Sequence, residues 1–202
     1  MIKDCLVINC TGKDDTIALK INNKFFLKKL QTNIIKYEAL TLIILDFIKQ
    51  NNIEVDQKFS IIVNSGPGSF SGIRIALAIT KGIKLVKKSN IYTYNSFLLN
   101  IAPYLKKKQS LISIQKTNNF YYYSESCFED NYTFTPPQKI DADCLQKENS
   151  IIVVPQEIVN DGIFNDISPK KIKIAEFNLK NIEILIENNL LENKLIKPLY
   201  WS

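Results

Sequence analysis

The segment GPGSFSGIRIA at residues 66–76 constrains the fold of this chain more than any other stretch. It follows the β-branched run FSIIV at 59–63, precedes a helical pattern at about 71–88, and holds three of the chain's 6 glycines. Glycine permits backbone angles that are closed to other residues, and proline stiffens a turn. The pattern therefore predicts a rigid strand–loop–helix unit, here called the glycine elbow. Its residues are Gly66, Pro67, Gly68, Ser69, Phe70, Ser71 and Gly72.

The elbow is also a candidate anion site, because backbone amides at the start of a helix attract phosphate and carboxylate groups. Its glycine spacing, however, is one residue longer than the dinucleotide-binding pattern G-x-G-x-x-G, and the next strand ends in Tyr94-Asn95 instead of an acidic residue. The loop also lacks the Gly-Lys-Ser/Thr ending of a phosphate-binding P-loop. A tight turn that binds no ligand stays open as the alternative.

Two residue counts limit the chemistry of any site. The chain has no histidine, which excludes Ser-His-Asp and Cys-His catalysis and every histidine-ligated metal site. Arginine occurs once, at Arg74, against 25 lysines. A cation is mildly unfavourable in the first turn of a helix, and a guanidinium pairs with a carboxylate in a bidentate way that lysine cannot copy. We expect Arg74 to bind a specific partner; a surface cation without a role is the alternative.

Hydrophobic periodicity divides the first half of the chain into short strands and longer helices. Three strands joined by tight turns come first, and helices then alternate with strands. A mixed sheet with helices packed against it is typical of a ribonuclease-H-like or actin-like ATPase lobe, an α/β fold. The expected strands are 4–8, 16–21, 25–30, 59–63 and 91–94, and the expected helices are about 33–50, 71–88 and 95–106.

The second half, from Ser110, is richer in strands and suggests a smaller, less regular lobe. The expected strands are 111–115, 120–126, 151–154 and 171–176, and a closing helix is expected at about 179–191. With 202 residues and 46% hydrophobic content, the chain is long enough for two such lobes. The expected domains are residues 1–108, which contain the elbow, and residues 109–202.

Both long helices of the first half are more apolar than an ordinary surface helix. The helix at 33–50 is apolar around nearly its whole circumference, with Glu38 in the thin polar strip that remains. Along the helix at 71–88, Ala78 and Gly82 lie in an apolar seam whose small residues allow another helix to approach closely. We expect both helices to bury a second face against a partner; burial between the chain's own two halves is the alternative.

Charge and composition bear on the cellular setting. The formal charge of +6 comes from scattered lysines without a dense patch, and the run Lys106–Lys108 suits the end of a helix. The four cysteines show no C-x-x-C spacing, and we recognise neither a membrane span nor a secretion signal. A reducing, cytoplasmic setting without membrane contact is therefore expected.

The stretch GPGSFSGIRIALAITKGI, together with the strand before it, resembles the signature of the TsaB family, also called YeaZ. The family's usual form is GPGSFTGLRIG followed by a helix of the Ala-Lys-Gly-Leu type, from which Ser71, Ile73 and Ala76 depart conservatively. The N-terminal hairpin, the helix containing Glu38 and the ending Pro198-Leu199-Tyr200 also lie where family members have them. The family's Asp-Thr-Ser-Thr, His-Ser-Glu and Asp-Ala-Arg are replaced by Asn9-Cys10-Thr11-Gly12, Lys36-Tyr37-Glu38 and Gln115-Lys116-Thr117.

The resemblance implies an actin-like fold and a role as the non-catalytic partner of TsaD, the subunit that transfers a threonylcarbamoyl group to the adenosine beside the tRNA anticodon. It implies that the elbow and its flanking helices, including Glu38, Arg74, Ala78 and Gly82, contact TsaD. The chain would be a heterodimer with TsaD, a homodimer when alone, and in contact with tRNA only indirectly, with recruitment of TsaE left open. Asn9 stands where an actin-like ATPase has a magnesium carboxylate, which agrees with a subunit without metal, cofactor or catalysis.

Two other functions stay open from the residues alone. A sugar- or acetate-kinase-like ATPase of the same fold would hold ATP with Thr11 and the elbow, and only Asp14 and Asp15 near the first hairpin are available to bind its magnesium. A basic RNA-binding module would rest on FYYY at 120–123, but it lacks aromatic residues interleaved with arginine. Strand alternation, with Phe120 and Tyr122 pointing inward, explains that run more simply.

Overall fold

The computed structural model describes residues 2–12, 15–30, 39–107, 109–117, 119–128, 132–147, 149–193 and 198–199. The chain forms two compact units, and each is described by itself. Unit 1 consists of Met1–Ser96 and Asn188–Ser202, and unit 2 consists of Phe97–Glu187. Within the described residues, no helix has the length and apolar character needed to cross a membrane.

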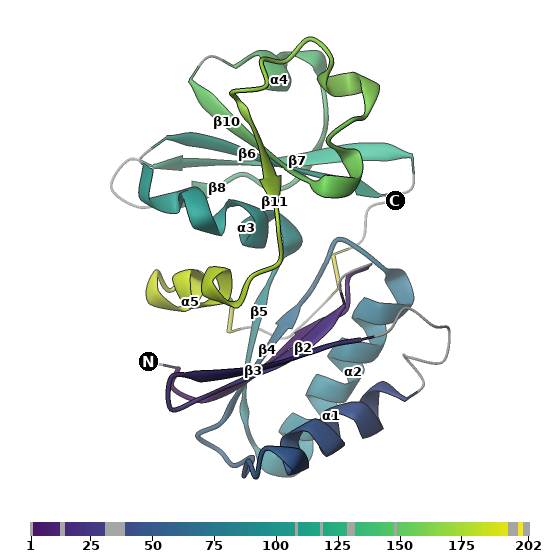
Figure 1. Ribbon diagram of the computed structural model, residues 1–202, viewed down its shortest axis with the longest axis vertical. Coiled ribbons are helices and arrows are strands. Elements are labelled where there is room, and N and C mark those ends of the chain that lie inside the picture. Colours follow the sequence, from purple (N-terminus) through teal and green to yellow (C-terminus); the bar gives the residue numbers. More distant parts are fainter. Residues whose placement is uncertain are drawn as a thin grey trace. The chain divides into compact units, whose positions relative to one another are not determined.

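Unit 1 is built on a five-stranded mixed sheet of order β3-β2-β1-β4-β5 (Figure 1). Strands β1, β2 and β3 are antiparallel, whereas β1, β4 and β5 are parallel. Parallel neighbours need a crossover connection, and α2 provides it between β4 and β5. The elements are β1 (Cys5–Asn9), β2 (Thr16–Ile21), β3 (Lys24–Lys29), α1 (Leu40–Gln50), β4 (Ser60–Asn64), α2 (Phe70–Lys87) and β5 (Asn90–Tyr94).

A two-residue turn joins β2 to β3. Asn22 and Asn23 have φ angles of 47° and 62°, as the two central residues of a type I′ hairpin turn require, and asparagine tolerates this conformation better than most residues. Asp4 accepts a hydrogen bond from the backbone amide of Asn22 at 2.9 Å. The turn sets a register in which Lys20 lies opposite Phe25.

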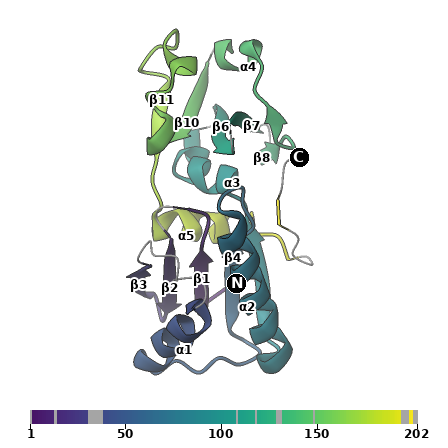
Figure 2. The same cartoon turned by 90° about the vertical axis from the view of Figure 1, so that its right-hand side faces the viewer.

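Helices α1 and α2 pack on one face of this sheet (Figure 2). The strand residues that meet them recur at every second position, because side chains alternate between the two faces of a strand. Removing this apolar surface from water is the main force that holds the helices to the sheet. The buried cluster joins Leu40, Ile44 and Phe47 of α1 and Ile73, Ala76 and Leu77 of α2 to Leu6, Ile8, Ile17, Leu19, Ile61, Val63 and Ile91 of the strands.

The C-terminal segment belongs to unit 1. Thr93 of β5 and Glu192 exchange two backbone hydrogen bonds of 2.9 Å, so Glu192 forms one antiparallel bridge beside β5. Further along, the amide of Leu199 donates to the carbonyl of Ser65 at 2.9 Å, directly after β4. The last described residues of the chain therefore contact the beginning of the glycine elbow.

Unit 2 holds a six-stranded mixed sheet of order β11-β10-β6-β7-β8, with β9 paired to β7. Strand β10 is parallel to both β6 and β11, and β6, β7 and β8 are antiparallel. Its buried cluster includes Ile112, Tyr123, Cys144, Val154 and Phe164. The elements are α3 (Ser96–Ile101), β6 (Ser110–Thr117), β7 (Phe120–Phe128), β8 (Tyr132–Phe134), β9 (Gln138–Lys139), α4 (Ala142–Gln146), β10 (Ser150–Pro155), β11 (Ile172–Ala175), α5 (Leu179–Glu187) and the 3₁₀ helices Ala102–Lys107, Gln156–Ile158 and Gly162–Phe164.

The two mixed sheets with their helices confirm the predicted α/β fold class. The units differ from the expected domains: the expected boundary after residue 108 lies inside unit 2, and residues 188–202 return to unit 1. The predicted first helix begins in the structure at Leu40, and its residues 33–38 lie outside the described residues. Sequence reasoning missed the short elements β8, β9 and α4.

The expected inward orientation of Phe120 is wrong. Its side chain is 48% exposed, and the buried aromatic residue of that strand is Tyr123, which lies on the opposite face. Tyr123 faces the core of unit 2 together with Ile112 and Ile114 of the neighbouring strand. The run FYYY alone could not show which face of the strand would meet that core.

Candidate functional site

The glycine elbow connects the end of β4 to the start of α2, as predicted. Gly66 has a φ of 104° and Gly68 a φ of 158°, backbone angles that residues with a Cβ rarely adopt. The hydroxyl of Ser69 accepts a hydrogen bond from the amide of Gly72 at 3.3 Å and so caps the helix at its N-terminus. The glycines therefore permit the turn, and a serine ends it.

Close contacts inside the chain explain both elbow glycines. A Cβ on Gly68 would lie 2.6 Å from the Cβ of Thr11 and closer still to the Thr11 carbonyl oxygen. That carbonyl accepts a hydrogen bond from the amide of Ser69 at 2.6 Å. A Cβ on Gly66 would lie 2.9 Å from Cδ1 of Ile73 and 3.3 Å from the carbonyl oxygen of Leu199. The elbow is thus packed against the β1–β2 connection and the C-terminal segment.

Buried polar side chains form hydrogen bonds with the backbone of the glycine elbow. The Asn64 amide nitrogen donates to Oδ1 of Asn9 at 2.8 Å, and Oδ1 of Asn64 accepts from the amide of Gly66 at 2.9 Å. Ser96 donates its hydroxyl to the carbonyl of Pro67 at 2.9 Å and its amide to the carbonyl of Gly66 at 2.8 Å. Because Asn9, Asn64 and Ser96 are all buried, these bonds satisfy groups that water does not reach.

Tyr94 closes this network beside Asn9. Its hydroxyl lies 3.5 Å from Oδ1 of Asn9. Burial raises the pKa of Tyr94 above its ordinary value of 10.0, because the charged phenolate would lose its hydration. The side chain therefore stays neutral across the physiological range and acts as a hydrogen-bond donor.

The structure also locates one of the two carboxylates that a magnesium-binding alternative needs. Asp15 is fully buried and accepts a hydrogen bond from the amide of Gly12 at 2.8 Å, whereas Asp14 lies outside the described residues. Among the residues that the structure describes, no group of three or more Cys, Asp and Glu side chains lies close enough to hold a metal ion. The absence of a metal and of a cofactor stays a prediction.

Beyond the elbow, the N-terminal turn of α2 is exposed. The guanidinium of Arg74 stacks on the ring of Phe70, with its central carbon 3.8 Å from the ring centroid. Both side chains are exposed, as is Ser71. Phe70 and Arg74 are four residues apart, so they lie on the same face of the helix. The predicted carboxylate partner of Arg74 stays a prediction.

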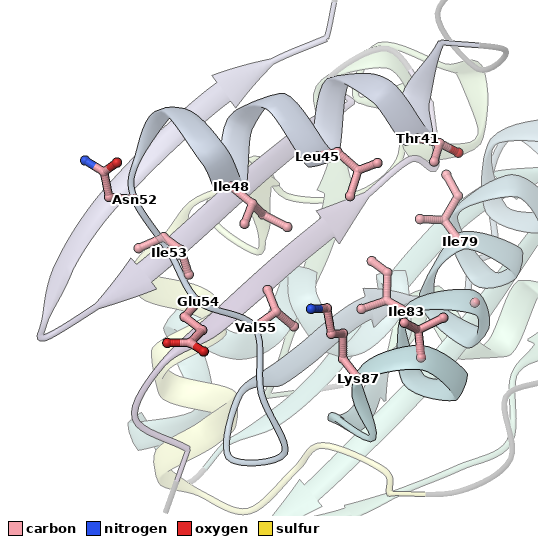
Figure 3. A pocket seen from close by; sticks show the side chains of 12 residues that line it. Thr41, Leu45, Ile48, Asn52, Ile53, Glu54, Val55, Ile79, Ile83 and Lys87 are labelled. Atoms are coloured by element: carbon pink, nitrogen blue, oxygen red, sulfur yellow. The ribbon is translucent and has the colours of Figure 1, made fainter.

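A groove of about 770 Å³ lies between α1 and α2 (Figure 3). Aliphatic side chains from both helices and from the loop after α1 line most of it, among them Leu45, Ile48, Val55, Ile79, Ile83 and Val86. Gly82 belongs to the same wall, and a Cβ added there would meet no atom within 4 Å. The exposed fraction of Val86 is 77%. This end of the helix pair therefore presents a continuous aliphatic surface, here called the α1–α2 face.

No family model matches the chain. The TsaB protein of tRNA threonylcarbamoyladenosine biosynthesis from Buchnera aphidicola subsp. Baizongia pistaciae is 33% identical over 87 residues, which cover 42% of this chain and 38% of that protein. YeaZ from Pseudomonas aeruginosa has the same fold, with a TM-score of 0.70 at 10% identity over 97% of this chain and 100% of YeaZ. A second structure, of a protein with similarity to peptidase YeaZ from Pseudomonas aeruginosa, gives a TM-score of 0.67 at 10% identity over 98% of this chain and 99% of that one.

Part of the chain is thus similar in sequence to a TsaB protein, and nearly the whole chain is similar in fold to YeaZ. The match to YeaZ also confirms the predicted actin-like, two-lobe fold. The sequence match spans well under two thirds of the length of the Buchnera relative.

The structure separates the predicted site residues into two groups. The elbow residues from Gly66 to Gly72 hold the N-terminal end of α2, with Arg74 just after them, while Gly82 lies in the α1–α2 face and Ala78 is exposed between the two ends. Glu38 lies outside the described residues. Sequence reasoning missed the loop residues Ile53 and Val55, which line the groove, because no helical periodicity marks them.

Proposed function

We propose that this chain is the non-catalytic scaffold subunit of the complex that makes threonylcarbamoyladenosine in tRNA, and that it binds the catalytic subunit TsaD through the α1–α2 face. The name of the Buchnera relative supports the pathway. The partner and the surface are inferred from the resemblance and from the chemistry of the face.

The α1–α2 face is the observation that carries this proposal. Leu45 and Val86 line the groove and expose large apolar side chains, and Leu42 and Leu85 are exposed elsewhere on the same two helices. Helices α1 and α2 already bury Leu40, Ile44, Ile73 and Leu77 against the sheet. A continuous apolar patch that is unnecessary for the core is characteristic of a protein–protein interface. Gly82, with open space above it, lets a partner helix approach the backbone of α2 closely. Helices of a structurally similar partner would complete a four-helix contact.

The residues around Asn9 support the proposal that the chain is not catalytic. Asn9 carries no charge with which to position magnesium, and its amide oxygen is already bonded to Asn64. The chain has no histidine to act as a general base near neutral pH. The glycine elbow is used for packing within unit 1, so its proposed role is to place the first turn of α2, including Arg74, against the partner.

Co-expression with the cognate TsaD, followed by size-exclusion chromatography, tests the proposal. A stable one-to-one complex is expected, and the isolated chain is expected to elute as a homodimer formed through the same face, because the patch is too large to stay wet. Adding TsaE to the complex shows whether a third subunit is recruited. The purified chain alone is expected neither to hydrolyse ATP nor to modify tRNA.

Two results would contradict the scaffold role. Failure of the two proteins to associate at micromolar concentrations would contradict the proposal that TsaD is the partner of this chain. Magnesium-dependent ATP turnover by the purified chain, abolished by Thr11→Val, would favour the kinase-like alternative instead.

A further inference from the structure

Strand β3 forms a second exposed surface of a different kind. It lies at the edge of its sheet, where its described partner is β2 (Figure 2). Its three apolar residues Phe25, Phe26 and Leu27 are exposed to 38%, 37% and 48%. Lysines surround them, namely Lys20 on β2 and Lys24, Lys28 and Lys29 on β3. No acidic residue occurs between Thr16 and Lys29.

The register places aromatic rings and cations together on each face of the strand. Phe25 lies opposite Lys20, and the Lys20 ammonium is 5.6 Å from the centroid of the Phe25 ring, within cation–π range. Lys29 falls on the same face as Phe25 because side chains alternate along a strand, whereas Lys24 and Lys28 flank Phe26 on the other. Each ring is therefore bordered by positive charge.

The charge of the molecule is concentrated in the unit that carries this strand. Unit 1 has 16 Lys and Arg against 8 Asp and Glu, whereas unit 2 has 10 against 12, so the net charge of +6 divides into +8 and −2. A surface of lysines and aromatic rings on a unit of this charge attracts a polyanion.

Protection of the sheet edge explains only part of this pattern. Lysines on an edge strand discourage pairing with another strand, but protection gives no reason to expose two phenylalanines and a leucine in a row. A protein partner is also a poor fit, since lysine is depleted from protein–protein interfaces. A single-stranded nucleic acid fits both features, because its phosphates pair with lysines and its unpaired bases stack on aromatic rings.

We propose that the β2–β3 hairpin binds single-stranded RNA along the exposed edge of β3, with Phe25 and Lys29 on one face of the strand and Lys24, Phe26 and Lys28 on the other. The lysines contact phosphates and the two rings stack on bases. RNA is chosen over DNA because of the proposed function, on which this choice rests. The surface gives the chain an RNA contact of its own, where the family resemblance implied only indirect contact with tRNA. It is separate from the α1–α2 face, so the two proposals fail independently.

Fluorescence anisotropy of the full chain with a labelled oligouridine tests the inference. The triple variant Lys24→Gln, Lys28→Gln, Lys29→Gln is expected to bind about tenfold or more weakly at low salt. Its slope of log affinity against log salt is expected to fall by about 2, which corresponds to about 0.7 for each lost phosphate contact on a single strand. A matched control, Lys3→Gln, Lys58→Gln, Lys170→Gln, removes the same charge from exposed positions elsewhere and is expected to change binding little.

A second variant tests the proposed stacking of bases on Phe25 and Phe26. Phe25→Leu with Phe26→Leu keeps the apolar bulk of the strand but removes the rings, and it is expected to weaken binding about tenfold without changing the salt slope. Duplex RNA of the same length is expected to bind more weakly than the single strand, because its bases are already stacked. The inference is overturned if the control triple variant weakens binding as much as the β3 variant, if the leucine variant binds like the parent, or if duplex RNA or an acidic peptide competes equally well. Loss of RNA binding with TsaD binding retained would leave the proposed function standing.

Discussion

At the N-terminal end of α2, Gly68 lies so close to Thr11 that an added methyl group would overlap the backbone of the β1–β2 connection, whereas at Gly82, near the other end, such a group would meet no atom within 4 Å. The first glycine is required by contacts inside the chain, and the second leaves space outside it. Both positions belong to the motif by which the family resemblance was found. Only the contacts show that one end of the helix supports the fold and the other offers a surface.

The largest expected effect comes from testing the two glycines with the same substitution. Gly68→Ala is expected to destabilise unit 1 by about 3 kcal/mol or more, because a Cβ clashes with Thr11 and the backbone angle is unfavourable for alanine. Gly82→Ala is expected to stabilise it by up to about 1 kcal/mol, since alanine favours the helix. Thermal unfolding followed by circular dichroism measures both, with shifts of about 2–4 °C per kcal/mol. If both substitutions change the stability equally, the two glycines do not differ in packing as the structure indicates.

The second prediction concerns association and uses a larger side chain at the exposed end. Gly82→Leu is expected to weaken binding to TsaD by about 5- to 150-fold, because overfilling a close helix contact costs about 1–3 kcal/mol. The stability of the free chain is expected to stay close to that of the parent, since the side chain projects into open space. Isothermal titration calorimetry gives the affinity, and Lys58→Leu serves as a control outside the α1–α2 face. An unfolded Gly82→Leu variant would place this residue in the internal core.

Arg74 lies in the first turn of α2, and its substitution distinguishes stacking within the chain from contact with a partner. Arg74→Lys keeps the charge but loses the planar guanidinium, so the stack on Phe70 is expected to lose less than about 1 kcal/mol of unfolding free energy. Binding to TsaD is expected to fall by about tenfold or more if the guanidinium makes a bidentate bond to a carboxylate. If calorimetry shows unchanged affinity together with lower stability, the arginine serves only α2 itself.

The fourth prediction concerns the pH dependence of the unfolding free energy, to which buried Tyr94 beside the elbow is expected to contribute more as the pH rises above 10. The folded chain holds the Tyr94 proton more tightly than the unfolded chain, because burial raises the pKa of Tyr94. This contribution is fully present below pH 10 and is lost above it, by about 1.4 kcal/mol for each pH unit. Tyr94→Phe is expected to flatten the dependence of unfolding free energy on pH above 10, as measured by urea titration. In unit 2, burial raises the pKa of Cys144 from 9.0 to about 11, so Cys144→Ala is the variant that separates the two contributions between pH 9 and 11.

Much of unit 1 was predictable because its signals are local. Short β-branched runs, the Asn22–Asn23 turn and the glycine elbow each identify an element from a few neighbouring residues. The strands of unit 1 and helix α2 lie within a few residues of their expected positions. The surplus of apolar residues on the first helix was also visible, and the exposure of Leu42 and Leu45 agrees with it. In unit 2 the strands β8 and β9 were missed, because elements of three and two residues carry too little periodicity to be recognised.

The sequence by itself determined the α/β class, the elbow and the absence of histidine chemistry, because each follows from residue type and local spacing. The tertiary structure alone decided how the elbow is used, since the overlap at Gly68 arises from Thr11, more than fifty residues earlier in the chain. It alone brought the C-terminal Leu199 to Ser65 and lined up Leu45 with Ile83 across the groove. It alone showed that Phe25 and Phe26 stay exposed among lysines at a sheet edge. Which side chains face inward and which face outward depends on contacts between distant segments, and no local pattern contains that information.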